Sequence, residues 1–125
     1  MHGLVYEYEV DPACIARFEE AYGPDGDGAG FFGASVSYLG TELLRDPMQP
    51  GRYLVIDRWT SADAAARFLA DRAEEYERRS RDTARLYLHE GHLGHSTSSL
   101  LADALGYRQG PHPHRPDRAL LVSCA

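Results

Sequence analysis

The segment RYLVIDRW, residues 52–59, is followed directly by TSADAAARF, residues 60–68, and these two segments decide the fold. The first segment is rich in β-branched, aromatic and aliphatic side chains, which favours a β-strand. Thr60 and Ser61 carry hydroxyl groups that can accept the free N–H groups at the start of a helix, and Asp63 adds a negative charge to its first turn. The sequence therefore predicts a strand that leads into a helix.

The residues on either side extend this unit into a sheet. Residues 46–51, DPMQPG, are strong turn formers that join two strands into an antiparallel hairpin. Residues 4–10 alternate apolar and polar side chains, which is typical of another strand, and the Asp11-Pro12 pair is typical of a helix start. We expect strands at 4–10, 37–45, 52–59 and 85–93, helices at 11–22 and 61–80, and a glycine-rich loop at 23–35.

These elements follow the order β-α-β-β-α-β over about residues 3–95. The order predicts an α+β fold of the ferredoxin-like kind, a four-stranded antiparallel sheet with two helices on one face. We assign residues 1–95 to this domain and residues 96–125 to a C-terminal extension. The extension carries the apolar run ALLV at 119–122, which predicts that it docks on the domain or on a partner subunit.

Both faces of the strand at 52–59 carry apolar side chains. Successive side chains on a strand point to opposite faces. Leu54 and Ile56 therefore point one way, and Tyr53, Val55 and Trp59 point the other way. Two helices can cover only one face of the sheet, so the second face is expected to need a cover.

The last predicted strand shows the same two-sided pattern. Leu86 and Leu88 are expected on one side, with Tyr87 and Leu93 on the other. Monomers seldom leave an apolar sheet face in water. The sequence therefore predicts a homodimer in which two sheets stack face to face.

Charge and composition exclude several classes of partner. The chain has 125 residues and a net charge of −6, which repels phosphate groups, so nucleic acid and anionic membranes are not expected partners. No window approaches the roughly 18 consecutive apolar residues of a membrane span, and a cytoplasmic location is expected. Cys14 and Cys124 have no metal-ligand spacing. Two free thiols in a reducing compartment are expected, with a disulfide as the alternative.

The chain contains the segments FEEAYGPDG (18–26), SYLGTELLRDP (37–47), GRYLVIDRWTSADAAARF (51–68) and HLGH (92–95). Together they resemble antibiotic biosynthesis monooxygenase domains of the dimeric α/β-barrel superfamily. The resemblance implies the fold and dimer described above, with a pocket between helices and sheet in each protomer. Characterised relatives include cofactor-free oxygenases of aromatic polyketides, quinol oxygenases and haem-degrading enzymes.

The resemblance also bears on cofactors. Polyketide-oxygenating and haem-degrading relatives use an Asn in the site, and the haem-degrading type takes its iron ligand from a His on the second helix. This chain has no Asn, and residues 61–80 contain no His. Haem degradation is therefore not expected. No cofactor is expected either, because an electron-rich substrate anion can pass an electron to dioxygen directly.

Three histidines lie in the segment HEGHLGH, residues 89–95. On a regular strand, positions three apart point to opposite faces, so His89, His92 and His95 cannot converge on one metal ion. No metal site is expected. His89 or His92 is a candidate general base, because imidazole titrates near neutral pH. The alternative is partial exposure near the strand end.

Asp57 lies within an otherwise apolar strand, next to Arg58. One interpretation is an ion pair between these two residues at the rim of the sheet. The other is a pocket carboxylate whose pKa is raised by burial.

Aromatic residues are the candidate substrate-binding groups. Trp59 and Tyr38 are candidate walls of the pocket, and the hydroxyl groups of Tyr6 and Tyr53 could hold a phenolic ligand. The alternative for each of them is an ordinary place in the core.

The leading hypothesis is a cofactor-independent monooxygenase that acts on an aromatic phenol, quinol or polyketide-like substrate. In it, His89 or His92 is the base, Asp57 orients that base, and Trp59 with Tyr38 forms the walls. The alternative is a non-catalytic dimer of the same fold that binds a small aromatic ligand or supports another enzyme. Haem binding is a third possibility.

Overall fold

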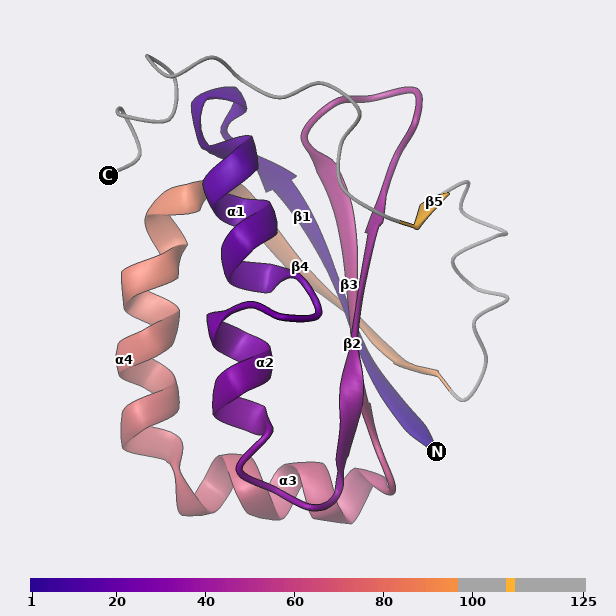
Figure 1. Ribbon diagram of the computed structural model, residues 1–125, viewed down its shortest axis with the longest axis vertical. Coiled ribbons are helices and arrows are strands. Elements are labelled where there is room, and N and C mark those ends of the chain that lie inside the picture. Colours follow the sequence, from indigo (N-terminus) through magenta and orange to yellow (C-terminus); the bar gives the residue numbers. More distant parts are fainter. Residues whose placement is uncertain (97–107, 110–125) are drawn as a thin grey trace.

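The computed structural model describes residues 1–96 and 108–109. An antiparallel sheet forms one layer, with strand order β4-β1-β3-β2-β5, and the helices lie on one of its faces (Figure 1). The strands are β1 (His2–Val10), β2 (Tyr38–Arg45), β3 (Arg52–Trp59), β4 (Tyr87–Ser96) and β5 (Arg108–Gln109). The helices are α1 (Ile15–Tyr22), α2 (Asp27–Phe32), α3 (Ala62–Asp71) and α4 (Ala73–Thr83), with 3-10 turns at Pro12–Cys14 and Ala84–Leu86.

The predicted ferredoxin-like arrangement is confirmed. Strands β1 to β4 form the antiparallel sheet in the expected order, and β3 spans the predicted residues. The hairpin between β2 and β3 turns at Gly51, whose φ of +93° lies in the region that glycine adopts most easily. The backbone N–H of Val10 donates to the Gly51 carbonyl over 2.7 Å, which ties this turn to the end of β1.

The segment predicted as a loop at 23–35 contains the short helix α2. Its glycines suggested a turn, but Gly26 instead permits a close approach between two helices. A Cβ atom at Gly26 would lie 2.3 Å from the Glu20 carbonyl oxygen of α1. Gly26 therefore serves helix packing, which the sequence pattern alone does not distinguish from a loop.

The single helix predicted at 61–80 is two helices. The N-cap is as predicted, because Ser61 Oγ accepts a 3.1 Å hydrogen bond from the Ala64 N–H. The helix breaks at Arg72, whose φ and ψ of −122° and 27° are not helical. The break turns the chain, so that α3 crosses the end of the sheet and α4 runs beside α2 (Figure 1). No glycine or proline marks this position, which explains why the sequence did not predict it.

The predicted division of side chains along β3 is confirmed. On the helix-covered face, Tyr53 and Val55 belong to one buried cluster and Trp59 to another. On the opposite face, Leu54 and Ile56 pack with Val5 and Leu44, and these four side chains are at most 3% exposed in the single chain. The apolar groups of this second face are therefore already covered within one chain.

Strand β4 departs from the regular alternation that the sequence suggested. Its pairing with β1 shifts register twice, between Val5 and Tyr6 and between Glu9 and Val10. Each shift places an extra residue on one strand, which resets the faces of the residues that follow. The predicted two-sided apolar pattern of this strand is wrong, because Leu86 lies in a 3-10 turn and Leu88 is 65% exposed.

Cys14 is disulfide-bonded, so the prediction of a free thiol at this position is wrong. Cys124 lies outside the described residues, as does the apolar run at 119–122. Of the predicted extension, β5 pairs with the end of β2, where Leu44 faces Gln109. Among the described residues, no helix has the length and apolar character to cross a membrane.

Candidate active site

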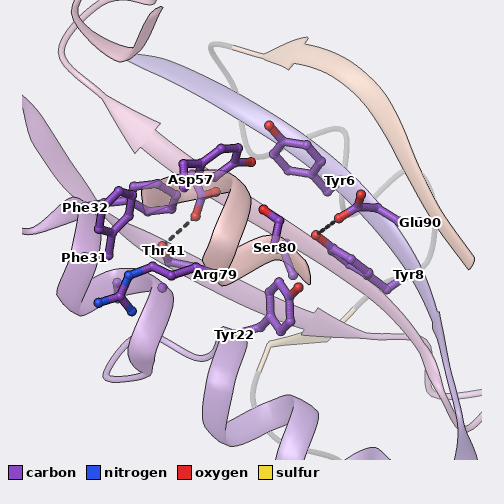
Figure 2. A pocket seen from close by; sticks show the side chains of 14 residues that line it. Tyr6, Tyr8, Tyr22, Phe31, Phe32, Thr41, Asp57, Arg79, Ser80 and Glu90 are labelled. Atoms are coloured by element: carbon purple, nitrogen blue, oxygen red, sulfur yellow. Dashed lines mark hydrogen bonds between the residues drawn. The ribbon is translucent and has the colours of Figure 1, made fainter. Parts of the chain in front are cut away.

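A cavity of about 80 Å³ lies between the helix-covered face of the sheet and helices α2 and α4 (Figure 2). Apolar walls come from Phe31 and Phe32 of α2 and Val55 of β3. Polar groups reach the cavity from β1 to β4 and from α1 and α4. They are Tyr6, Tyr8, Tyr22, Thr41, Asp57, Tyr76, Arg79, Ser80 and Glu90.

Asp57 is the one buried charged side chain in the described part of the chain, with an exposed fraction of 8%. It stands at the centre of the sheet, between Leu4 of β1 and Thr41 of β2. Thr41 Oγ1 donates a 2.7 Å hydrogen bond to Asp57 Oδ1, and the described residues give this carboxylate no other. This environment matches the second interpretation of the sequence, in which Asp57 is a carboxylate buried at a pocket.

The ion pair of Asp57 with Arg58, the first interpretation, does not form. Arg58 lies on the opposite face of the sheet, where its guanidinium pairs with Glu42. Burial therefore raises the pKa of Asp57 to about 6, and the hydrogen bond from Thr41 lowers it by a smaller amount. A carboxylate that titrates near neutral pH can accept and return a proton under working conditions.

Thr41 has a second hydrogen-bonding partner besides Asp57. Its hydroxyl group hydrogen bonds with the hydroxyl group of Tyr38. The Tyr38 ring packs against Phe32 and Trp59, with centroid separations of 5.6 and 5.4 Å. Tyr38 is partly exposed and does not line the cavity.

Two tyrosines beside the carboxylate act as neutral donors. Burial raises the pKa of Tyr6, and the neighbouring Tyr76 and the negative charges of Asp57 and Glu90 raise it further. Burial likewise raises the pKa of Tyr76. Both phenols therefore keep their protons at neutral pH and can hydrogen bond to an oxygen of a bound molecule.

The far end of the cavity holds a second carboxylate. The Tyr8 hydroxyl donates a 2.5 Å hydrogen bond to Glu90 Oε2 (Figure 2). Tyr8 and Glu90 face each other across β1 and β4, and the register shifts in β4 bring Glu90 to this face. The cavity thus has an acidic group at each end and phenols between them.

The two predicted histidines do not line this cavity. His92 stacks on Tyr6 with a centroid separation of 4.8 Å, on the helix-covered face, but it is exposed. His89 faces Glu9 across the β1–β4 ladder, is exposed, and so belongs to the opposite face. The hydrogen-bonding partner of Asp57 is Thr41 of β2.

The predicted aromatic residues divide between two places. Tyr6 lines the cavity, whereas Trp59 and Tyr38 lie next to it in an aromatic cluster with Phe32 and Phe68. Tyr53 belongs to the other buried cluster, where its hydroxyl donates a 2.5 Å hydrogen bond to Glu19 Oε2. Of the seven predicted site residues, the structure brings Asp57 and Tyr6 to the cavity.

Several cavity residues were missed by the sequence analysis. Thr41 carries a usable signal, because it lies opposite Asp57 once β2 and β3 are aligned as a hairpin. Ser80 and Arg79 depend on the turn at Arg72, and Glu90 depends on the register shifts. No local pattern marks either feature.

Metal ligation finds no support in the described part of the chain. No group of three or more His, Cys, Asp or Glu side chains there is arranged to hold a metal ion. Asp57 and Glu90 are the acidic residues at the cavity, and each is hydrogen bonded to a hydroxyl group of the protein.

The family model described as antibiotic biosynthesis monooxygenase matches residues 1–73. The chain belongs to this family. The match includes β1 to β3, α3 and therefore Asp57, Thr41 and Tyr6 of the cavity. Comparison with curated proteins finds no match.

Solved structures agree with this assignment. A mutant of SnoaB from Streptomyces nogalater, described as a cofactor-independent oxygenase, has 25% identity and a TM-score of 0.62 over 78% of this chain and 92% of that one. Another SnoaB structure has 24% identity and a TM-score of 0.58, over 78% and 91% of the two chains. An antibiotic biosynthesis monooxygenase candidate from Nitrosomonas europaea shares the fold, with 12% identity and a TM-score of 0.59 over 79% and 99%. The description of SnoaB is consistent with the expectation of no cofactor.

Proposed function

We propose that this member of the family is a cofactor-independent monooxygenase that oxidises an aromatic phenol, quinol or polyketide-like substrate, with Asp57 as its general base. The observation that carries the proposal is a buried carboxylate of pKa about 6 at the wall of an aromatic cavity. A base is most effective when its pKa lies near the working pH. The base role moves from the histidines to Asp57 because neither His89 nor His92 lines the cavity.

The chemistry needs only the substrate and dioxygen. Asp57 removes a proton from the substrate, and the resulting anion transfers one electron to dioxygen. The two radicals combine into a peroxide, which takes the proton back from Asp57. Asp57 then removes the remaining proton at that carbon as the O–O bond breaks, which leaves a carbonyl group and hydroxide. The hydroxide takes that proton from Asp57 and becomes water, so Asp57 ends ionised. A CH₂ group and O₂ thus become C=O and H₂O, so atoms and electrons balance.

Tyr6 and Tyr76 supply the second requirement of this chemistry. The substrate anion carries its charge on a phenolic or ketonic oxygen, and neutral donors aimed at such an oxygen stabilise it in a water-poor site. The raised pKa of each phenol keeps it protonated while it donates. Phe31, Phe32 and Val55 provide the apolar contact for the rings of the substrate.

A non-catalytic binding role is the competing function. The small cavity, about 80 Å³, and its ring of neutral phenols would also hold a phenolic ligand without turnover. Oxygen consumption separates the two functions, because binding alone consumes none.

The decisive experiment measures oxygen uptake with anthrone and with a monocyclic quinol. We expect consumption of one O₂ per quinone formed from anthrone, and loss of at least a hundredfold in rate in D57N, since a positioned base contributes about 10²–10⁴. E9Q is the matched control, because Glu9 is an exposed carboxylate of the same sheet. H89A/H92A is expected to keep the activity. Ligand binding without oxygen uptake would establish the competing function, and full activity in D57N would remove Asp57 from the base role.

We infer in addition that the active form is a homodimer. Large apolar side chains at the outer strands remain for a second copy to cover, with Leu39 53%, Leu88 65% and Leu93 47% exposed in the single chain. Sedimentation at micromolar concentration tests this inference, and a monomer there would contradict it.

A cytoplasmic location stays a prediction. The disulfide at Cys14 argues for an oxidising compartment instead, because thiols are kept reduced in most cytoplasm. Thiol labelling in denaturant of the protein from freshly lysed source cells distinguishes the two, because denaturation exposes the buried Cys14: a labelled Cys14 supports the cytoplasm, and a protected one contradicts it.

A further inference from the structure

The inference concerns the hydroxyl groups behind Asp57, and it rests on the proposed role of that residue. Thr41 contacts both Asp57 and Tyr38, so three side chains from two adjacent strands form one hydrogen-bonded chain. Asp57 and Thr41 line the cavity, and Tyr38 does not. The chain of groups therefore begins at the cavity and ends outside it, at a partly exposed residue.

The direction of the hydrogen bonds follows from the charge of Asp57. An ionised carboxylate can only accept hydrogen bonds, so Thr41 donates its single hydroxyl proton to Asp57 Oδ1. The Thr41 oxygen must then accept from the Tyr38 hydroxyl. When Asp57 is protonated, the same contacts can run in reverse, with Asp57 donating to Thr41 and Thr41 donating to Tyr38.

We propose that Thr41 and Tyr38 form a two-hydroxyl proton relay that connects Asp57 with the outside of the protein. In one passage, Asp57 gives its proton to Thr41, Thr41 gives its own proton to Tyr38, and Tyr38 releases its own to water. Each hydroxyl gains one proton and loses one, so both end neutral and Asp57 ends ionised. The reverse passage protonates Asp57.

The relay matters when substrate binds while Asp57 is protonated, because Asp57 must lose that proton before it can act as the base and the substrate displaces the water of the cavity. Tyr6 and Tyr8 of β1, Tyr22 of α1, Tyr76 and Arg79 of α4 and Glu90 of β4 are the other titratable groups that line the cavity. Arg79 and Glu90 are exposed, whereas the four tyrosines are at least partly buried. The route through Thr41 ends at Tyr38, which does not line the cavity, so it does not depend on water in the cavity.

The relay is tested first without turnover. Carbon NMR follows the Asp57 carboxyl signal through a pH titration, with phenol filling the cavity under nitrogen so that no oxidation occurs. In the wild-type protein we expect one averaged signal, because protonated and ionised Asp57 interconvert rapidly. In Y38F we expect exchange at least tenfold slower and two separate signals, although the hydrogen bond from Thr41 to Asp57 remains.

The matched variants separate the relay from a structural role. T41V removes the central hydroxyl and is expected to slow exchange as Y38F does, whereas T41S keeps the hydroxyl and is expected to restore it. Y53F is the control for Tyr38, because the Tyr53 hydroxyl binds Glu19 away from the cavity. Exchange in Y38F as fast as in the wild type would overturn the relay, whether or not the protein has oxygenase activity.

A kinetic measurement completes the test. We expect kcat of Y38F at pH 6 to fall on the order of tenfold with KM unchanged, which is less than the loss of about 10²–10⁴ for a base itself, because Asp57 stays in place. The wild-type rate is expected to depend on more than one exchangeable proton in mixtures of H₂O and D₂O, and the Y38F rate on one. A change in KM alone would contradict the relay and indicate packing. Absence of turnover in the wild type would overturn the proposed function, and the NMR result would still decide the relay.

Discussion

The hydroxyl of Thr41 lies 2.7 Å from Oδ1 of Asp57 and donates to it, across the pairing of β2 with β3. This contact stabilises the ionised carboxylate in a place where burial opposes ionisation. The balance between the two effects sets the pH at which Asp57 becomes a base. The hydrogen bond from Thr41 therefore affects both the pairing of β2 with β3 and the protonation of Asp57 in the cavity.

The pH dependence of oxygenation is the first prediction. A base must be ionised, so kcat/KM is expected to rise with pH through about 6, the pKa of Asp57, and to level off above it. In T41V the rise should move to higher pH, because the bond that lowers this pKa is gone. T41S should keep the wild-type profile. A profile in T41V that coincides with the wild-type profile would show that another group controls the rate.

The stability of D57N is the second prediction. The folded pKa of Asp57, about 6, lies above the ordinary 3.8, so the folded protein binds more protons than the unfolded chain between these values. Stability is therefore lost as pH rises through this window. At about 1.4 kcal/mol per pH unit, the loss is about 3 kcal/mol. Asn carries no charge, so D57N should gain up to about that amount over the wild type at pH 8.

Urea unfolding at pH 4.5 and pH 8 measures this difference. We expect D57N and the wild type to differ less at pH 4.5 than at pH 8, and E9Q to show no such change. A difference between D57N and the wild type that does not vary with pH would contradict the raised pKa of Asp57.

The hydrogen bond between Tyr8 and Glu90 gives the third prediction. The Tyr8 ring packs among aromatic neighbours that include Phe18, Tyr22 and Tyr87. Y8F keeps this packing and removes the 2.5 Å bond to Glu90, so the free energy of unfolding should fall by about 1 kcal/mol. A double-mutant cycle with E90A, which removes the acceptor, should show coupling of similar size. Strictly additive effects would mean that the contact contributes no stability.

The turn at Gly51 gives the fourth prediction. Its φ is +93°, and a Cβ atom there would lie 3.0 Å from the Val10 carbonyl oxygen. G51A should therefore cost about 1–2 kcal/mol in the free energy of unfolding. G30A is the matched control, because a Cβ at Gly30 of α2 meets no atom within 4 Å. That variant should be neutral or gain about 0.5–1 kcal/mol. Equal effects of the two changes would contradict the strain assigned to Gly51.

The sequence predicted the centre of the molecule well and its edges less well. Strand β3 lies between strong turn formers and a helix cap and carries apolar side chains on both faces, so its bounds and the division of its two faces followed directly. These features depend on local pattern. For Asp57 the same pattern left two interpretations open, an ion pair with Arg58 and a pocket carboxylate, and the contacts of the two side chains in the structure distinguish them.

The remaining features depend on contacts between distant segments. The break at Arg72 brings Arg79 and Ser80 to the cavity without any local breaker residue. The register shifts of β4 decide that Glu90 faces the cavity and His89 does not. His89 was a candidate because imidazole can act as a base near neutral pH. The face of the sheet on which it lies depends on a register shift that only the pairing of β4 with β1 reveals.

Those two irregularities of β4 determine how a change in strand length acts on one wall of the candidate site. Leu88 and Leu93 are the residues that the pairing with β1 skips, so removal of either would let the ladder become regular while Glu90 still faces Tyr8. Removal of a paired residue between them, such as Gly91, would instead turn the side chains beyond it over to the other face. Residue roles can therefore be transferred between homologues only after the pairing of this strand has been aligned.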